Sequence, residues 1–294
     1  MRITDDQLEH WRQHGYVLVP NYLNEVQIDQ ALANVYLHFP TDGEYRAAPR
    51  RYSDLPQPAQ TELPFAGDVL NDLAVHPDIV DFAERVIGTT DLRLTQSILW
   101  AKYAGRGDEN QILHVDYLNN TLTFPSDAAG FVQLPSILYL TDVTVELGPT
   151  HIVSREFTPD DLLTPWKRAP NDFPDLYERE CAVTVAAGTL LLYNVNIFHR
   201  GSRLTAKTGA RFTFHNVYRA AGCDWMGWTA FPRHGLNPSM QRFLERASVR
   251  QRCLLGFPEP GHRFWTEQTV AGVGSRYPAM DMAPYRDACA EQSS

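Results

Sequence analysis

The sequence predicts a mainly β fold, an antiparallel barrel or jelly roll with helices packed outside it. Between Leu92 and Arg219, six segments rich in β-branched and aromatic residues are separated by Gly, Pro, Asn and Asp. Helical patterns precede this region. With 294 residues and 44% hydrophobic content, the chain is expected to form one large domain with a sizeable core.

The first part of that domain, residues 1–90, is expected to be largely helical. Residues 3–15 place Leu8 and Trp11 at helical spacing, and Gly15 suits the end of a helix. A short strand at 16–20 and a second helix at 24–37 follow. The polar, Pro-rich stretch 40–63 is interpreted as a long irregular loop of the kind that often contacts ligands. His76-Pro77-Asp78 then predicts a helix that runs to Ile87 and stops at Gly88.

Residues 91–220 are expected to form the jelly-roll core. The predicted strands lie in LRLTQSILWAKY, ILHVDYL, FVQLPSILYLTDV, GPTHIVS, CAVTVAAGTLLLYN and ARFTFHNVYR. A charged, partly helical insert at 156–180 interrupts them. Residues 221–294 form a C-terminal extension with helical character near 238–252, to which the sequence assigns no role.

Charge and cysteine content exclude several classes of protein. A net charge of -9 and a pI near 5.5 argue against a nucleic-acid partner, since phosphate binding needs clustered Lys and Arg. The four cysteines show no CxxC spacing, so no structural zinc site or redox pair is predicted. Without a signal peptide or an apolar span, the protein is expected to be soluble, cytoplasmic and not bound to membranes.

The sharpest local motif is His114-Val115-Asp116, which lies within an apolar strand pattern. Side chains two residues apart on a strand project from the same face, so both groups are expected to converge on one point. A single HxD motif is weak evidence, because surface or hydrogen-bonded pairs of this kind are common. In the chain's other HxD, at His76, the proline and the helix start disfavour a metal site.

A second cluster strengthens the case for a metal. The apolar strand AAGTLLLY is followed by Ile197-Phe198-His199, which places a histidine at the end of a buried strand. Taken alone, His199 could equally be a core histidine. Two histidines and one carboxylate on one face of a metal leave positions open for a co-substrate and dioxygen, an arrangement typical of iron(II) oxygenases.

Arg211 is the third element of the predicted site. It follows the turn at 206–210 and opens the next strand. An oxoacid that chelates iron through its 1-carboxylate and 2-keto oxygen leaves its far carboxylate buried, and an arginine offers that group a charged bidentate partner. Without the histidine cluster, Arg211 would be interpreted as an ordinary surface arginine.

These residues, with their surroundings, resemble the phytanoyl-CoA dioxygenase family of iron(II)- and 2-oxoglutarate-dependent oxygenases. The resemblance covers most of the chain and is carried by ITDDQLEHWRQHGYVLVPNYL, VHPDIVDFAERVIG, QSILWAKYAGRGDENQILHVD, YLTDVTVELGPTHIVS and AAGTLLLYNVNIFHRGSRLTAKTGAR. It implies a double-stranded β-helix of the cupin-like kind. It also implies iron(II), 2-oxoglutarate and dioxygen as cofactor and co-substrates, with a small organic molecule hydroxylated and succinate and carbon dioxide released.

Carried over residue by residue, the resemblance makes His114, Asp116 and His199 the metal ligands and Arg211 the oxoacid-binding arginine. In related hydroxylases a glutamine and a lysine six residues apart precede the HxD, and Gln96 and Lys102 match that spacing. The chain departs from the family at Gly148–Glu156, where a Pro-Gly-Ser-His ending is lost. It departs again after the second histidine, where Gly201 precedes Ser202, the serine expected to contact the oxoacid. Because Asp116 is a carboxylate, the halogenating branch is disfavoured.

Further residues are candidate walls of the cavity, although each also fits a simple packing role. They are His151, His215, Trp100, Tyr117 and Tyr139, with Trp225-Met226-Gly227-Trp228 as a possible lid. Two rival functions stay open: a non-catalytic member of the fold that binds a small ligand, and a cupin-like zinc or manganese enzyme that does not use 2-oxoglutarate. Neither the substrate nor the oligomeric state follows from the sequence.

Overall fold

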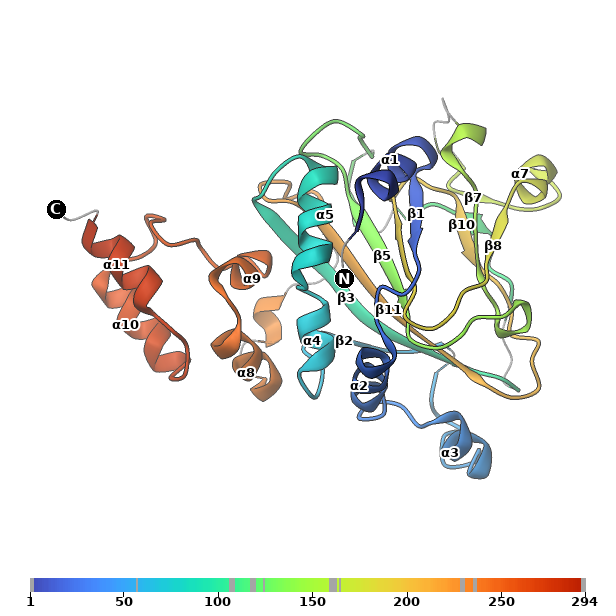
Figure 1. The fold of residues 1–294 in the computed structure, drawn as a ribbon, viewed down its shortest axis with the longest axis horizontal. Coiled ribbons are helices and arrows are strands. Elements are labelled where there is room, and N and C mark those ends of the chain that lie inside the picture. Colours follow the sequence, from blue (N-terminus) through green and yellow to red (C-terminus); the bar gives the residue numbers. More distant parts are fainter. Residues whose placement is uncertain are drawn as a thin grey trace.

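Two antiparallel β-sheets face each other and form the centre of the molecule (Figure 1). The computed structural model describes residues 3–56, 58–105, 109–116, 120–123, 125–158, 163, 165–227, 231–234 and 237–291. The large sheet has the order β1 (Tyr16–Val19), β9 (Leu190–Tyr193), β5 (Leu134–Tyr139), β11 (Ala210–Ala220), β3 (Leu92–Tyr103) and β2 (Ala59–Glu62). The small sheet has the order β7 (Lys167–Arg168), β4 (Leu113–His114), β10 (His199–Gly201), β6 (Thr150–Ile152) and β8 (Cys181–Val183). This architecture confirms the predicted jelly roll.

Alternation along the strands decides which side chains lie between the sheets. Leu191 and Tyr193 of β9 pack with Ile137 and Ile152 in a cluster between the two sheets. Leu190 and Leu192 point the other way, into the main hydrophobic core. β3 and β11 are the longest strands and pair along their whole length, with one register shift at Val217/Tyr218. They therefore form a continuous wall on one side of the space between the sheets.

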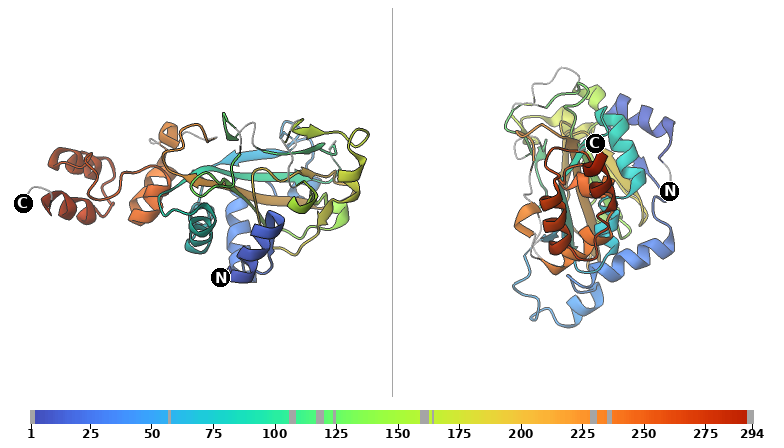
Figure 2. Two further views of the ribbon diagram at one scale, coloured as in Figure 1. Left: turned by 90° about the horizontal axis from the view of Figure 1, so that it is seen from above. Right: turned by 90° about the vertical axis from the view of Figure 1, so that its left-hand side faces the viewer.

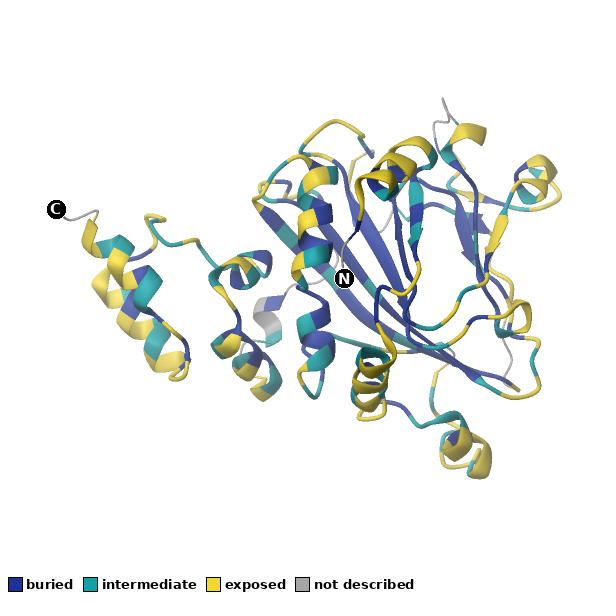
Figure 3. Ribbon diagram, viewed as in Figure 1, coloured by how far each residue is buried: buried dark blue, intermediate teal, exposed yellow. Residues whose placement is uncertain are grey.

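Helices cover the outer face of the large sheet, and its strands are buried while the outer faces of the helices are exposed (Figure 3). They include α1 (Asp5–His14), α2 (Glu25–Val35), α4 (Val69–Leu73) and α5 (Pro77–Ile87). The predicted ends of α1 and α5 are confirmed. Thr4 forms a capping box with Gln7, and Gly15 and Gly88 each end a helix in the left-handed conformation.

Three sequence predictions need correction. The stretch 40–63 is not one irregular loop, because it holds α3 (Asp42–Ala47), which a Thr41–Glu44 capping box starts, and the edge strand β2. The strand around His114 spans only Leu113–His114, so Asp116 lies just beyond it. His199 is the first residue of β10, after a loop that follows β9, and not the end of the preceding strand.

The remaining helices lie in the insert and after β11. The insert contains β7 and α7 (Pro174–Glu178), and the short helix η2 (Arg155–Phe157) lies at its start. α8 (Pro238–Arg246) and α9 (Val249–Leu254) confirm the predicted helical character of 238–252. α10 (Glu267–Arg276) and α11 (Ala283–Glu291) form a hairpin at one end of the molecule, away from the sheets (Figure 2). Among the described residues, no helix combines the length and apolar content required to cross a membrane.

Candidate metal centre

His114, Asp116 and His199 come together between the sheets. His114 and His199 are directly opposite each other in the β4–β10 pair, so their side chains project from the same face. The His114 Nε2 atom lies 3.7 Å from Asp116 Oδ1, and the His199 Nε2 atom lies 3.4 Å from Asp116 Oδ2. The potential ligand atoms of all three residues lie within 4.8 Å of one another. One metal ion can reach all three with small side-chain adjustments.

Backbone hydrogen bonds orient both imidazole rings for metal binding. The Nδ1 atom of His114 lies 2.9 Å from the Ile112 carbonyl oxygen, and that of His199 lies 3.0 Å from the Ile197 carbonyl oxygen. A carbonyl only accepts, so each Nδ1 donates and each Nε2 keeps its lone pair for a metal. Burial and the neighbouring His199 lower the pKa of His114 to about 4, which keeps this ring neutral near pH 7. This donor set fits a divalent metal.

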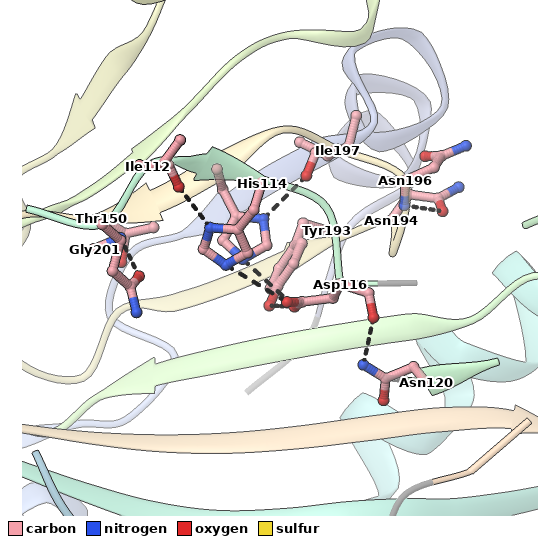
Figure 4. Close-up of polar contacts among 12 residues, drawn as sticks. Ile112, His114, Asp116, Asn120, Thr150, Tyr193, Asn194, Asn196, Ile197 and Gly201 are labelled. Carbon is pink, nitrogen blue, oxygen red and sulfur yellow. Dashed lines mark hydrogen bonds and ion pairs between the residues drawn. The ribbon is translucent and has the colours of Figure 1, made fainter. Parts of the chain in front are cut away.

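The carboxylate of Asp116 is held by its surroundings as well (Figure 4). The Tyr193 hydroxyl donates to Asp116 Oδ2 at 3.0 Å, and Asn120 Nδ2 donates to the Asp116 backbone carbonyl at 2.9 Å. The Asp116 amide donates to the Val195 carbonyl at 3.2 Å, which ties the residue to the loop before β10. Burial and the adjacent Asp116 raise the pKa of Tyr193 well above its ordinary value, so the phenol stays a donor.

The three candidate ligands open into a cavity of about 410 Å³. β3 and β11 form its opposite wall, and Arg211 and Lys102 lie directly opposite each other at one end of that wall. Both side chains are buried, each with an exposed fraction of 8%. Gln96 also lines the cavity, toward the other end of β3. The geometry therefore brings together the metal candidates and three of the four predicted oxoacid-binding residues.

Ser202 does not line this cavity. Its hydroxyl donates to the Pro149 carbonyl at 2.7 Å, so the side chain has a structural partner. Of the other candidates, Trp100 and His215 line the cavity, and their rings lie 5.8 Å apart. Burial, with the charge of Arg211, lowers the pKa of His215 to about 3.

The remaining candidates lie elsewhere. Tyr139 is fully buried and donates to the Thr150 hydroxyl at 2.9 Å, while His151 pairs with Glu180 at 2.9 Å, away from the candidate ligands. Tyr117 and Trp228 lie outside the described residues. The described part of the lid candidate pairs with the segment after Asp116, because Leu122 donates to the Trp225 carbonyl and Gly227 donates to the Asn120 carbonyl.

Sequence reasoning missed Tyr193, Asn120 and Gln111. Gln111 lines the cavity and accepts a hydrogen bond from the Gly201 amide at 2.7 Å. A Cβ at Gly201 would lie only 2.9 Å from the Gln111 Oε1 atom, so the glycine makes room for that side chain. The one available signal was Gly201 itself, which stands where the family resemblance sometimes implies a serine. No signal in the sequence pointed to Tyr193, because a tyrosine in an apolar strand is normally interpreted as a core residue.

Comparison with solved structures identifies the fold. The structure is similar to the non-haem α-ketoglutarate-dependent carbocyclase SnoK from nogalamycin biosynthesis, with a TM-score of 0.53, 21% identity and coverage of 74% of this chain and 85% of that one. It is also similar to HygX from Streptomyces hygroscopicus with nickel, 2-oxoglutarate and hygromycin B bound. There the TM-score is 0.55 with 16% identity, over 75% of this chain and 88% of HygX. At these identities the likeness confirms the double-stranded β-helix fold.

Sequence comparison assigns the family. Dioxygenase af480 of Aspergillus fumigatus is 24% identical over 212 residues, which span 68% of this chain and 62% of that relative. The sequence model of the phytanoyl-CoA dioxygenase family matches residues 11–211, more than half of the chain and the region that holds the candidate ligands and Arg211. The chain therefore belongs to the phytanoyl-CoA dioxygenase family, which confirms the resemblance seen in the sequence.

Proposed function

We propose that this protein is an iron(II)- and 2-oxoglutarate-dependent dioxygenase that hydroxylates a small organic molecule and releases succinate and carbon dioxide. One observation carries the proposal. The cavity combines a His-Asp-His cluster on one wall with two buried cations, Arg211 and Lys102, on the other. Membership of a dioxygenase family supports the same reaction class.

In this proposal, Nε2 of His114, Nε2 of His199 and the carboxylate of Asp116 hold iron(II). Iron bound by three side chains on one face supplies open positions for an oxoacid and dioxygen, together with the oxidising chemistry. The chain's own part is to fix the ligands. The Ile112 and Ile197 carbonyls set the histidine tautomers, and the Tyr193 hydroxyl keeps its proton directed at Asp116 Oδ2.

Arg211 and Lys102 bind the far carboxylate of 2-oxoglutarate. Two cations directly opposite each other repel, and a dicarboxylic co-substrate offsets that repulsion by placing a negative charge between them. Gln96 lies further along β3, so in this proposal it contacts the substrate or the 2-keto end and not the far carboxylate.

The substrate is proposed to be a small organic molecule. Related folds bind such molecules: HygX is solved with hygromycin B, and SnoN with nogalamycin RO. A cytoplasmic location and the absence of nucleic-acid or membrane partners stay predictions from the sequence. Both rival functions fit the site less well. Neither a simple binding protein nor a cupin-like enzyme that does not use an oxoacid accounts for the buried pair of cations, Arg211 and Lys102.

Succinate formation tests the proposal. Protein loaded with iron(II) should convert 2-oxoglutarate to succinate, slowly without substrate and faster when a metabolite extract contains one. Asp116→Gly should retain some iron and 2-oxoglutarate but form no hydroxylated product, whereas His151→Ala, which changes a histidine outside the cavity, should retain wild-type turnover. Wild-type turnover per bound iron in Asp116→Gly would contradict the assignment of the ligands.

A further inference from the structure

The strands β3 and β11 run side by side (Figure 1). The wall that they form carries two pairs of cations, one at each end. Lys102 and Arg211 are directly opposite each other at the end proposed to bind 2-oxoglutarate. Arg93 and Arg219 are directly opposite each other at the other end. Neither strand contains an aspartate or glutamate. In a chain with a net charge of -9, this is a local concentration of positive charge.

Both arginines of the second pair lie on the cavity side of the sheet. Their neighbours along each strand belong to the main core, which lies behind the sheet; these are Leu92, Leu94, Tyr218 and Ala220. Since side chains alternate along a strand, Arg93 and Arg219 point to the opposite face. On β11 this is also the face of Arg211, Thr213, His215 and Val217, all of which line the metal cavity.

The protein neutralises this second pair only partly. Arg93 Nη1 pairs with Asp91 Oδ1 at 2.6 Å, but the Asp91 side chain is 68% exposed, and such a pair contributes little. Arg219 Nη1 donates to the Ala220 carbonyl at 2.7 Å, and Arg219 Nε is buried without a hydrogen-bond partner among the described residues. Two like charges directly opposite on a strand pair are destabilising unless an anion joins them.

A groove of about 640 Å³ gives a ligand access to these arginines. Thr95, Trp225 and Gly227 line it together with Arg93 and Arg219, so it combines positive charge with an aromatic surface. The exposed Asp224 also lines it and is the one carboxylate among its described lining residues. The groove adjoins the metal cavity, because Thr95 precedes Gln96, and Gly227 donates to the carbonyl of the cavity residue Asn120.

The strand β11 determines the distance between the candidate metal centre and the pair Arg93 and Arg219. His215 lines the same cavity as His114, Asp116 and His199, on the wall opposite these candidate ligands. Arg219 follows four residues later on the same face. At about 3.4 Å per residue, the two positions are roughly 13 Å apart. A molecule that reaches from the metal to Arg219 is therefore about as long as an extended ten-atom chain.

We propose that Arg93 and Arg219 bind an anionic group of the substrate, a carboxylate or a phosphate, and so set which carbon lies at the metal. This inference rests on the proposed function and narrows its substrate class to anionic molecules. Two guanidinium groups offer the paired donors that match either anion.

Direct binding tests the proposal without a known substrate. Protein loaded with Ni(II), which does not support turnover, and saturated with 2-oxoglutarate is titrated with decanoate, decyl phosphate and decan-1-ol below their aggregation limits. Tryptophan fluorescence reports binding, since Trp225 lines the groove. Saturating 2-oxoglutarate keeps the probes away from Arg211. The same titration is then repeated without metal and without 2-oxoglutarate. Binding of an anion under these conditions supports the groove even if the proposed metal and 2-oxoglutarate chemistry fails.

We expect at least one of the two anions to bind wild-type protein tenfold or more tightly than the alcohol. Arg93→Gln and Arg219→Gln should each remove most of that preference and leave decan-1-ol binding unchanged, while Arg219→Lys should retain part of it. Arg250→Gln, which removes a surface arginine paired with Asp81 and Glu84, is the matched control and should behave as wild type. Tighter decyl phosphate binding identifies a phosphorylated substrate, and tighter decanoate binding identifies a carboxylic acid. Equal affinity for anions and alcohol in wild type, or equal loss of both in Arg219→Gln, would overturn the proposal.

Discussion

Replacing Tyr193 with phenylalanine should weaken metal binding without disturbing the fold. The Tyr193 hydroxyl donates to Asp116 Oδ2 at 3.0 Å from a fully buried position in β9. Its ring also packs edge-on against His199, with the ring centroids 4.9 Å apart. Phenylalanine retains this ring contact and removes only the hydroxyl. The variant therefore isolates one hydrogen bond to one candidate ligand.

The size of the effect follows from the charge on the acceptor. A hydrogen bond to a charged group contributes about 1.5–3 kcal/mol, and about 1.4 kcal/mol corresponds to a tenfold change in affinity. We therefore expect the metal dissociation constant to rise about 10- to 100-fold, the range typical for loss of a residue that orients a metal ligand.

Competition between the protein and a chromophoric chelator for Fe(II), under anaerobic conditions, measures this constant. Tyr218→Phe is the matched control. Its hydroxyl is equally buried but donates to the Ala74 carbonyl at 2.7 Å, on the other face of the large sheet. Unchanged metal affinity in Tyr193→Phe, or an equal loss in Tyr218→Phe, would refute the positioning role of Tyr193.

Three further changes test other parts of the account. Arg211→Leu should weaken 2-oxoglutarate binding by about 3 to 5 kcal/mol, because a buried charge loses its partner, and should leave metal affinity largely unchanged in calorimetric titrations. The folded-state pKa of His215 is about 3 against 6.5 when unfolded, so the unfolded chain binds the extra proton and stability should fall as pH drops from about 6.5 toward 3. In metal-free protein, His215→Gln should flatten that slope, by at most about 1.4 kcal/mol per pH unit in urea unfolding. His76→Ala removes the cap that accepts from the Asp78 amide at 3.3 Å, so it should lower the free energy of unfolding by about 1 kcal/mol. The metal affinity of His76→Ala should equal that of the wild type. A lower affinity would mean that the second HxD motif has a role in the site.

The sequence was most informative where local patterns and the fold agree. Capping residues and left-handed glycines located α1 and α5, and the apolar strand pattern located β3 and β11 almost to the residue. The edge strand β2 was missed because Ala59–Glu62 is short, largely polar and stabilised by pairing with β3 more than by its own side chains. Pairing across distant segments is not encoded in the local pattern.

The same limit applies to the site. His114, Asp116, His199 and Arg211 were identifiable because they occur in motifs with fixed spacing. The second cation pair was not, because Arg93 and Arg219 are 126 residues apart in sequence and become neighbours only through the register of β3 and β11. The chain as a whole is acidic, so its net charge gave no indication that β3 and β11 form a positively charged wall.

Anaerobic titration of the Fe(II)-loaded protein with 2-oxoglutarate tests the central claim most directly, because the metal-to-ligand absorption band requires iron and oxoacid in one site. Wild-type protein should develop the band with one iron per chain. His114→Ala and His199→Ala should each abolish it, while His151→Ala should retain it. A band of wild-type intensity in both ligand variants, or no band in wild-type protein that has bound iron, would contradict the assignment of this cavity as an iron(II)- and 2-oxoglutarate-dependent active site.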